Sequence, residues 1–207
     1  MNMKVLMING SPRQNANTLI AFKEMTDIFD REGIEYEIMN IGNKDIRGCI
    51  ACRTCHESGK CVFDDEVNEA AEKFEKADGL VIGSPVYYGS ANGTLISFLD
   101  RLFYSIKFDT RMKVGASVVV ARRGGLTATF DELNKYFTIS EMPLATSTYW
   151  NQIHGRIAGE ANEDAEGLQV MRNMARNMVF LMRSIELGKE KYGLPEKEEG
   201  ISTSFIR

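Results

Sequence analysis

Continuous apolar runs alternate along the chain with stretches whose apolar residues recur every three or four positions. Two of the runs, at 4–9 and 79–84, stop at Gly10 and Pro85, as strands buried on both faces of a parallel sheet do. The segment 35–41 alternates apolar with polar residues, which is typical of a strand with one face partly exposed to water. The pattern predicts five strands, at 4–9, 35–41, 79–84, 114–121 and 144–149.

Helices are expected between these strands. The clearest apolar stripe follows one face of a helix, because its residues are spaced three and four apart. It consists of Leu95, Phe98, Leu99, Leu102, Phe103 and Ile106. The other helices are expected at 18–32, after the capping residues Asp64 and Asp65, around 130–137 and at 164–187. Strands that alternate with helices predict a doubly wound, parallel α/β sheet.

The last expected helix, at 164–187, also has apolar residues spaced alternately three and four apart. Packing against the sheet is the favoured interpretation. A seam between the helices of two subunits is the second, since a strict seven-residue repeat supports both. The polar segment after Gly188 matches no packed element, and we expect it to be frayed or to form an arm that reaches another subunit.

The length of 207 residues suits a single domain with a complete core, at 1–207, because a chain of this size buries roughly 70% of its unfolded surface. Within it we expect a cysteine-rich insertion at 42–63 and a C-terminal helix and tail at 164–207. The net charge of −4, with scattered basic residues, argues against nucleic acid and against an anionic membrane as partners. No apolar run is long enough for a signal sequence or a membrane span, so a soluble, cytoplasmic protein is expected.

The loop that follows the first expected strand, at 10–18, has the composition of an anion site. Ser11, Asn17 and Thr18 supply neutral hydrogen-bonding groups. Arg13 supplies positive charge, and the helix start that follows has backbone N–H groups without intrahelical partners. The loop contains neither a dinucleotide fingerprint nor a Walker sequence, so a terminal monophosphate fits it better than a dinucleotide or a triphosphate. The alternative is a helix cap without a ligand.

Two further loops, at 85–90 after the third expected strand and at 122–125 after the fourth, are expected at the same edge of the sheet. This is the edge at which open parallel sheets bind ligands. Tyrosine rings, glycines that permit close backbone approach, and arginines suit a flat heterocycle, so these loops and the phosphate together point to flavin mononucleotide (FMN). The residues expected along the ring are Pro85, Val86, Tyr87, Tyr88, Gly89, Arg123, Gly124 and Gly125, with Arg122 or Arg123 balancing negative charge on the flavin. Without a ligand, the tyrosines would cap the core and the glycines would form a plain turn.

All four cysteines fall within one short segment, with the spacing C-x2-C-x2-C-x5-C. They are Cys49, Cys52, Cys55 and Cys61. A disulfide framework is not expected in a cytosolic domain of this size, and the separated C-x2-C pairs of structural zinc sites are missing. Bacterial ferredoxins hold three corners of a cubane with C-x2-C-x2-C, so the pattern favours a [4Fe-4S] cluster, with zinc and free thiols as the alternatives. His56 is expected beside the site without ligating, and His154 is expected to be structural.

A set of motifs distributed from residue 4 to about residue 187 carries a family resemblance. They are Gly10-Ser11-Pro12-Arg13, Asn17-Thr18, the cysteine run, Asp64-Asp65, Gly83-Ser84-Pro85-Val86-Tyr87, Leu99-Asp100-Arg101 and Tyr149-Trp150-Asn151. Together they resemble the NADPH-dependent FMN reductase group of flavodoxin-like proteins, and most closely its iron-sulfur flavoprotein branch. The cysteine run is the most specific element of the resemblance.

The resemblance implies a flavodoxin-like three-layer sandwich with strand order 2-1-3-4-5 and FMN held by the three loops. It also implies a homodimer or homotetramer in which the cluster of one subunit approaches the flavin of its neighbour. By motif match, the phosphate is assigned to Ser11, Arg13, Asn17 and Thr18, with Leu19 beside them in the cofactor site.

These interpretations combine into an NAD(P)H-dependent flavin oxidoreductase. FMN would take a hydride from NAD(P)H, or single electrons from a ferredoxin-like protein, and pass them to a small-molecule acceptor, while the cluster carries one electron at a time. No side chain is expected to act as a catalytic acid or base, because the cofactors supply the chemistry. The alternatives are a non-enzymatic FMN electron carrier and a flavoprotein whose cysteine loop binds zinc or no metal.

Overall fold

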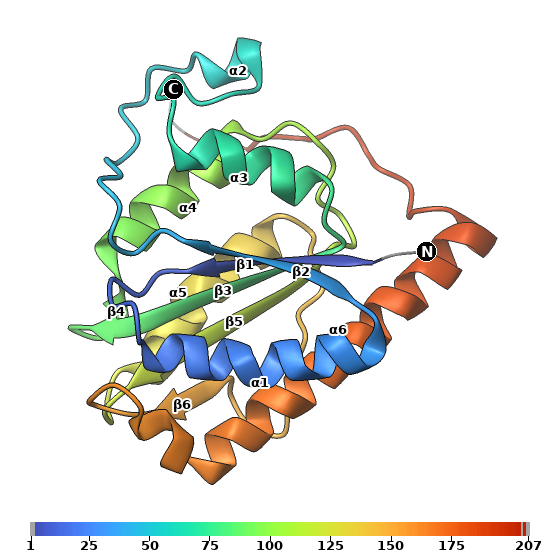
Figure 1. The fold of residues 1–207 in the computed structure, drawn as a ribbon. Coiled ribbons are helices and arrows are strands. Elements are labelled where there is room, and N and C mark those ends of the chain that lie inside the picture. Colours follow the sequence, from blue (N-terminus) through green and yellow to red (C-terminus); the bar gives the residue numbers. More distant parts are fainter. Residues whose placement is uncertain (1–2, 204, 206–207) are drawn as a thin grey trace.

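Five parallel strands form the centre of the molecule, in the order β2-β1-β3-β5-β6 (Figure 1). The computed structural model describes residues 3–203 and 205, so the outermost residues of the domain expected at 1–207 lie outside the described part. The parallel strands are β1 (Lys4–Asn9), β2 (Glu35–Asn40), β3 (Gly79–Tyr87), β5 (Val114–Ala121) and β6 (Gln152–His154). A two-residue strand, β4 (Ser90–Ala91), pairs antiparallel with the end of β3. With β4 set aside, the expected order 2-1-3-4-5 is confirmed.

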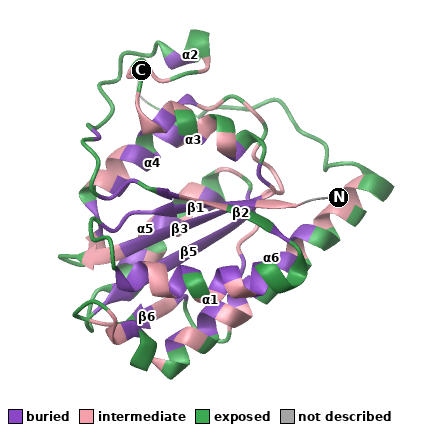
Figure 2. Ribbon diagram, viewed as in Figure 1, coloured by how far each residue is buried: buried purple, intermediate pink, exposed green. Residues whose placement is uncertain are grey.

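Helices cover both faces of the sheet and complete three layers (Figure 1). α1 (Asn17–Glu32) and α6 (Ala165–Tyr192) lie on one face, and α3 (Glu66–Glu75), α4 (Gly93–Ser105) and α5 (Leu126–Ile139) lie on the other. Side chains alternate between the two faces of each strand, which divides the apolar residues of β1, β3 and β5 between two cores. Figure 2 shows the central strands as buried and the outward faces of the helices as exposed.

α6 packs its methionine-rich stripe against the sheet, as the favoured interpretation of that stripe predicts. The buried members include Met171, Met174, Met178 and Met182. The helix runs past the predicted end at 187 to Tyr192. A Cβ on Gly188 would meet no other atom within 4 Å, so the helix continues there without crowding. The positive charges of Lys189 and Lys191 in the last turn stabilise the helix by interacting with the negative end of its dipole. Neither α6 nor any other helix of the described part has the length and apolar composition that crossing a bilayer requires.

The prediction of a fifth strand at 144–149 is wrong in position. The strand is β6, and Leu144 forms only an isolated bridge with β5. Between the two the chain leaves the edge of the sheet, where the rings of Tyr149 and Trp150 are half exposed and pack against each other with centroids 4.9 Å apart. At this edge both rings contact solvent instead of the core.

Several boundaries also differ from the pattern. α2 (Cys55–Ser58) lies within the cysteine-rich insertion, and the 3-10 helix η1 (Glu160–Glu163) precedes α6. β3 continues past the predicted end at 84, because residues beyond it pair with β5 on one side and with β4 on the other. The hairpin of β3 and β4 consequently projects from the sheet (Figure 1).

We expect Gly115→Ala to destabilise the fold. A Cβ at this position of β5 would lie 2.5 Å from Cδ1 and 2.6 Å from Cγ of Phe137, and overpacking a filled core costs about 1–3 kcal/mol. Gly188→Ala is the matched control, because its Cβ meets nothing within 4 Å and alanine favours a helix by up to about 1 kcal/mol. Urea unfolding measures both free energies, and equal values for the two variants would contradict this packing.

Candidate functional site

An open cleft lies at the carboxyl ends of the central strands, the edge at which open parallel sheets bind ligands. Four segments supply residues to its wall: 11–18 between β1 and α1, 85–87 at the end of β3, 120–122 at the end of β5, and 155–158 after β6. Segments far apart in the sequence therefore meet in one place.

The start of α1 forms one end of the cleft. Among the described residues no side chain caps this helix, whose N-cap is Ala16, and its first turn carries no acidic residue. Thr18 is buried there, and Ser11 Oγ accepts a hydrogen bond from the backbone N–H of Arg13 (3.4 Å). The positive end of the helix dipole thus meets the cleft beside a hydroxyl-bearing loop and a guanidinium, which suits an anion such as a phosphate.

The amide of Asn17 links the start of α1 to the loop after β6. Its Nδ2 donates to the carbonyl oxygen of Ile157 (2.9 Å), and its Oδ1 accepts from the backbone N–H groups of Gly159 (3.1 Å) and Ala161 (3.3 Å). A Cβ on Gly155 would lie 2.5 Å from the same Nδ2, so the loop passes close to the amide. These bonds use Oδ1 twice and one of the two N–H groups of Nδ2, so a phosphate contact of Asn17 would come from its other side-chain N–H or from its backbone.

The loops after β3 and β5 contact each other at two glycines, Gly89 and Gly125. Gly89 and Gly125 have φ of +76° and +89°, in the left-handed region. A Cβ on Gly125 would lie 2.9 Å from the Cα of Gly89 and 2.9 Å from Cγ1 of Val86. Tyr88 has φ +52° and a fully exposed side chain. The close contact between the glycines thus holds the hairpin so that Tyr88 stands in solvent at its tip.

Two polar side chains fix this hairpin to the rest of the sheet edge. Glu132 of α5 accepts hydrogen bonds from Ser90 Oγ (2.9 Å) and from the backbone N–H of Ala91 (2.8 Å). The buried side chain of Asn92 donates to the carbonyl oxygen of Gly10 (2.7 Å). The loops after β1 and β3 are therefore held in a fixed relation, as a site for a rigid ligand requires.

The structure brings part of the predicted cofactor site together. The predicted residues that line the cleft are Ser11, Arg13, Asn17, Thr18, Pro85, Val86 and Tyr87. The predicted residues outside its wall are Leu19, Tyr88, Gly89, Arg123, Gly124 and Gly125. Leu19 packs against the core between α1 and α6, and Arg122 lines the cleft where Arg123 does not. The cofactor contacts of all these residues stay predictions.

The loop after β6 was missed by the sequence pattern. Gly155, Arg156 and Ala158 line the cleft, and Arg156 adds a guanidinium to its wall. The misplaced strand at 144–149 hid this loop, because its expected carboxyl end came too early in the chain. Had the strand been located at 152–154, the rule that ligands bind beyond the carboxyl ends would have included it.

His154 and Asp164 anchor the end of β6 to the start of α6. The backbone N–H of His154 donates to Asp164 Oδ2 (2.7 Å), and the ring Nδ1 lies 3.1 Å from the same oxygen. Asp164 also caps α6 by accepting from the backbone N–H of Gly167 (2.9 Å). Burial acts to raise the pKa of Asp164, but these hydrogen bonds outweigh burial and hold the pKa below its usual range. His154 thus has the structural role expected of it.

The four cysteines line a second pocket, between the cysteine-rich insertion and α4. None of them is in a disulfide: Cys49 and Cys52 are exposed, Cys61 is half-buried and Cys55 is buried. Within residues 3–203 and 205, no three His, Cys, Asp or Glu side chains are grouped closely enough to hold a metal ion. The pocket therefore collects the predicted ligands without arranging them as a finished metal site.

The backbone around Cys52 has an unusual conformation. Ala51 and Arg53 have φ of +55° and +63°, a region that residues other than glycine rarely adopt, and Thr54 returns to the right-handed region. Alternation of this kind turns backbone N–H groups into an anion-binding concavity, as at many iron-sulfur sites. The N–H of Ala51 donates to Cys49 Sγ (3.4 Å), and hydrogen bonds with Thr54 lower the pKa of Cys52. The loop is therefore suited to holding negative charge.

Comparison with known proteins shows similarity to flavoproteins in sequence and in fold. The family model for NADPH-dependent FMN reductase matches residues 3–155. An iron-sulfur flavoprotein of Methanocaldococcus jannaschii is 34% identical over 192 residues, covering 89% of this chain and 100% of that protein.

Two solved structures share the flavodoxin-like fold. RosB with the bound intermediate 8-demethyl-8-formylriboflavin-5'-phosphate matches with a TM-score of 0.71 at 17% identity, covering 99% of this chain and 94% of RosB. NAD(P)H:quinone oxidoreductase from Methanothermobacter marburgensis matches with a TM-score of 0.67 at 16% identity, covering 86% of this chain and 96% of that one. At these identities the likeness shows the fold alone.

We expect Asn17→Ala to loosen the loop after β6. The N–H groups of Gly159 and Ala161 would lose their acceptor, and leaving buried donors unsatisfied costs about 1–3 kcal/mol. Thermal unfolding and limited proteolysis of 155–163 measure the effect. Exposed Asn15→Ala is the control and should match the wild type. If both variants were cut at the wild-type rate with unchanged stability, the anchoring role of Asn17 would be wrong.

Proposed function

Because the chain belongs to the NADPH-dependent FMN reductase family, in its iron-sulfur flavoprotein branch, we propose that it passes electrons between NAD(P)H, FMN and a [4Fe-4S] cluster. Family membership makes the chain an FMN-dependent oxidoreductase. The donor, the cluster and the residues that hold each cofactor are the proposal. The observation that carries it is the convergence of four loops on one cleft at the uncapped start of α1.

The cleft suits FMN at both of its ends. Ser11, Arg13 and Thr18, with the backbone at the start of α1, would hold the phosphate, because a helix start and a guanidinium both attract a doubly charged anion. Residues 85–87 would lie along the isoalloxazine, and the loop at 122–125 would flank it. Bound FMN supplies hydride acceptance and single-electron exchange. The chain supplies binding, orientation and charge.

Positive charge on the cleft wall supports NAD(P)H as the electron donor. Arg13, Arg122 and Arg156 all line the cleft, which is more guanidinium than one phosphate needs. The phosphates of a nicotinamide nucleotide are a second anionic group that such side chains recognise. The description of the family, which names NADPH, agrees with this donor.

The cysteine loop suits a [4Fe-4S] cluster in its ligand set and in its backbone. Four thiols line one pocket, and a cubane takes four thiolates. The left-handed backbone at Ala51 and Arg53 provides N–H donors for a negatively charged group. Similar proteins carry the name iron-sulfur flavoprotein. A cluster bound here would supply one-electron transfer, with Cys49, Cys52, Cys55 and Cys61 as its ligands.

The remaining partners belong to the same proposal. A small-molecule acceptor or a ferredoxin-like protein would exchange electrons with the chain, and the family resemblance implies a homodimer or homotetramer. Exposed aromatic rings at Tyr88, Tyr149 and Trp150 give the surface residues of the kind that protein interfaces favour.

Removing a phosphate contact should weaken FMN binding without unfolding the chain. We expect Arg13→Gln to raise the Kd for FMN about 10- to 150-fold, since a hydrogen bond to a charged group contributes roughly 1.5–3 kcal/mol. Thr18→Val should raise it by up to about 10-fold, because a neutral hydrogen bond contributes roughly 0.5–1.5 kcal/mol. Valine keeps the packing of this buried side chain. Fluorescence titration of the FMN-free protein measures each Kd.

Arg31→Gln is the control for this titration. Arg31 is exposed in the last turn of α1, at the end opposite the cleft, so its loss should leave the Kd unchanged. If Arg13→Gln and Thr18→Val also kept the wild-type Kd, the phosphate would bind elsewhere.

Cys52→Ser should remove iron and leave FMN. We expect the iron and acid-labile sulfide of the anaerobically purified variant to fall well below wild-type values, because serine is a poor substitute for a cluster thiolate. FMN content should stay unchanged, since no cysteine lines the cleft. Metal and sulfide analysis with flavin extraction measures all three quantities.

His56→Ala is the matched control within the same loop. The ring of His56 packs against that of Tyr104, with centroids 5.2 Å apart, and its loss should leave the iron content at the wild-type value. Wild-type protein that contains zinc and no sulfide would identify the loop as a zinc site instead.

A further inference from the structure

Arg101 on α4 is a charged side chain in the interior of the molecule. Its side chain is 1% exposed, and it is the largest of the fully buried side chains described. Its neighbours on the buried face of the helix, Leu99 and Leu102, are apolar. Burying a guanidinium is costly unless its charge is compensated and its N–H groups are paired. An apolar residue would fill this position without that cost, so the charge calls for a specific explanation.

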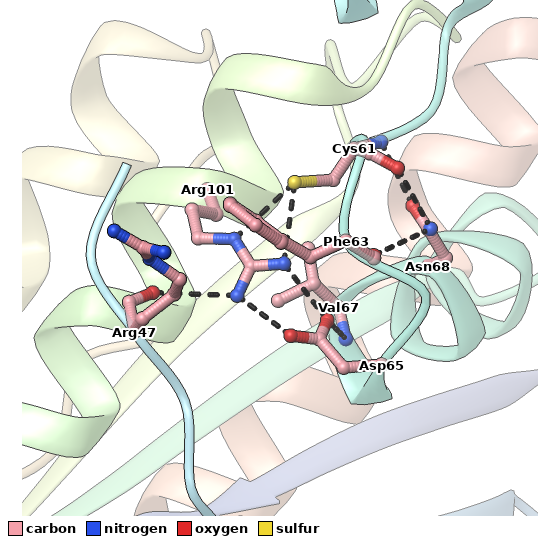
Figure 3. A network of polar contacts seen from close by, with 7 residues as sticks. All are labelled: Arg47, Cys61, Phe63, Asp65, Val67, Asn68 and Arg101. Carbon is pink, nitrogen blue, oxygen red and sulfur yellow. Dashed lines mark hydrogen bonds and ion pairs between the residues drawn. The ribbon is translucent and has the colours of Figure 1, made fainter. Parts of the chain in front are cut away.

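All five N–H donors of Arg101 have partners (Figure 3). Nη1 donates to Asp65 Oδ2 (2.7 Å) and to the carbonyl oxygen of Arg47 (3.3 Å). Nη2 donates to Asp65 Oδ1 (2.9 Å) and to Cys61 Sγ (3.2 Å), and Nε donates to the same sulfur (3.2 Å). The guanidinium carbon also lies 4.9 Å from the centre of the Phe63 ring.

The sulfur of Cys61 thus receives two of the five charged donors. A neutral thiol is a weak acceptor and satisfies such donors poorly. A thiolate that ligates iron carries negative charge and still accepts hydrogen bonds, and hydrogen bonds to the sulfurs are one of the ways in which proteins adjust iron-sulfur sites. The arrangement therefore fits Cys61 as a cluster ligand better than as a neutral thiol without a metal.

The backbone of Cys61 is held as firmly as its side chain. Asn68 of α3 accepts from the backbone N–H of Cys61 (2.9 Å) and donates to its carbonyl oxygen (3.0 Å). Asp65, the second partner of the guanidinium, is the N-cap of α3. Cys61 is consequently tied to two helices that pack on the sheet, whereas Cys49 and Cys52 are exposed. The pocket therefore has one side, at Cys61, that these hydrogen bonds hold in place, and another side, at Cys49 and Cys52, that is exposed to solvent.

We propose that Arg101 is a positioning residue that presents Cys61 as the pre-arranged ligand of the cluster and places a fixed positive charge on its sulfur. This inference rests on the proposed cluster in the cysteine loop. Reducing a cluster adds one electron, supplied by the external donor, and so adds one negative charge next to this guanidinium. Net charge and hydrogen bonds to sulfur set the reduction potential. Arg101 therefore raises the potential, and Asp65 lowers it.

Three variants of the whole 207-residue chain, purified without oxygen, test the proposal by redox titration followed by electron paramagnetic resonance. Arg101→Gln removes the positive charge and should shift the midpoint potential to a more negative value. Asp65→Asn removes the negative charge, keeps an N-cap acceptor, and should shift it to a more positive value. Arg31→Gln is the control, because Arg31 is exposed in the last turn of α1, on the other face of the sheet from α3 and α4. Its potential should match the wild type.

Opposite shifts of the two variants, at wild-type FMN content, support the proposal, because simple loosening of the loop would move both potentials in the same direction. Wild-type potentials in both variants, with full iron content, would overturn it while leaving the proposed cluster intact. If Arg101→Gln does not fold, Asp65→Asn decides alone, and an unshifted potential overturns the proposal. Wild-type protein without iron and sulfide would contradict the proposed function itself, and this inference with it.

Discussion

Burial of the central strands on both faces is the constraint on which the site depends. Helices cover β1, β3 and β5 from two sides, so polar side chains that bind a ligand have room only where the strands end. The strands are parallel, and their carboxyl ends therefore share one edge. The register sets the loops in place, since Asn9 lies beside Gly83 and Pro85 beside Val120. The positions of the uncapped start of α1 and of the hairpin of β3 and β4 follow from this pairing.

Much of this architecture could be predicted from the apolar pattern, because long buried strands and helical stripes leave strong periodic signals. β6 left no such signal: it is short, lies at the sheet edge, and buries Ile153 between two residues that are not buried. The role of Asn17 was equally hidden, since its partner Ile157 lies 140 residues further along the chain. The cleft walls at 11–18 and 85–87, and Arg122, are therefore predictable from the sequence, whereas the wall that depends on β6 is not.

The cysteine loop shows the same division between local and distant information. Spacing alone identified the four candidate ligands, because ligand spacing is local. The contact between Arg101 and Cys61 depends on how α4 packs against the insertion, which no local pattern reports. The left-handed backbone at Ala51 and Arg53 was also invisible in the sequence, because neither residue type favours it. Strain of this kind is characteristic of functional segments, and here it coincides with the exposed side of the cysteine pocket.

The most direct test of the flavin site is the ultraviolet-visible spectrum of the protein, isolated without oxygen and supplied with saturating FMN. The expected spectrum has flavin absorption bands on top of a broad iron-sulfur absorption, and FMN is retained after gel filtration. A colourless protein that takes up no FMN would contradict the central claim that the edge of this sheet is a flavin site.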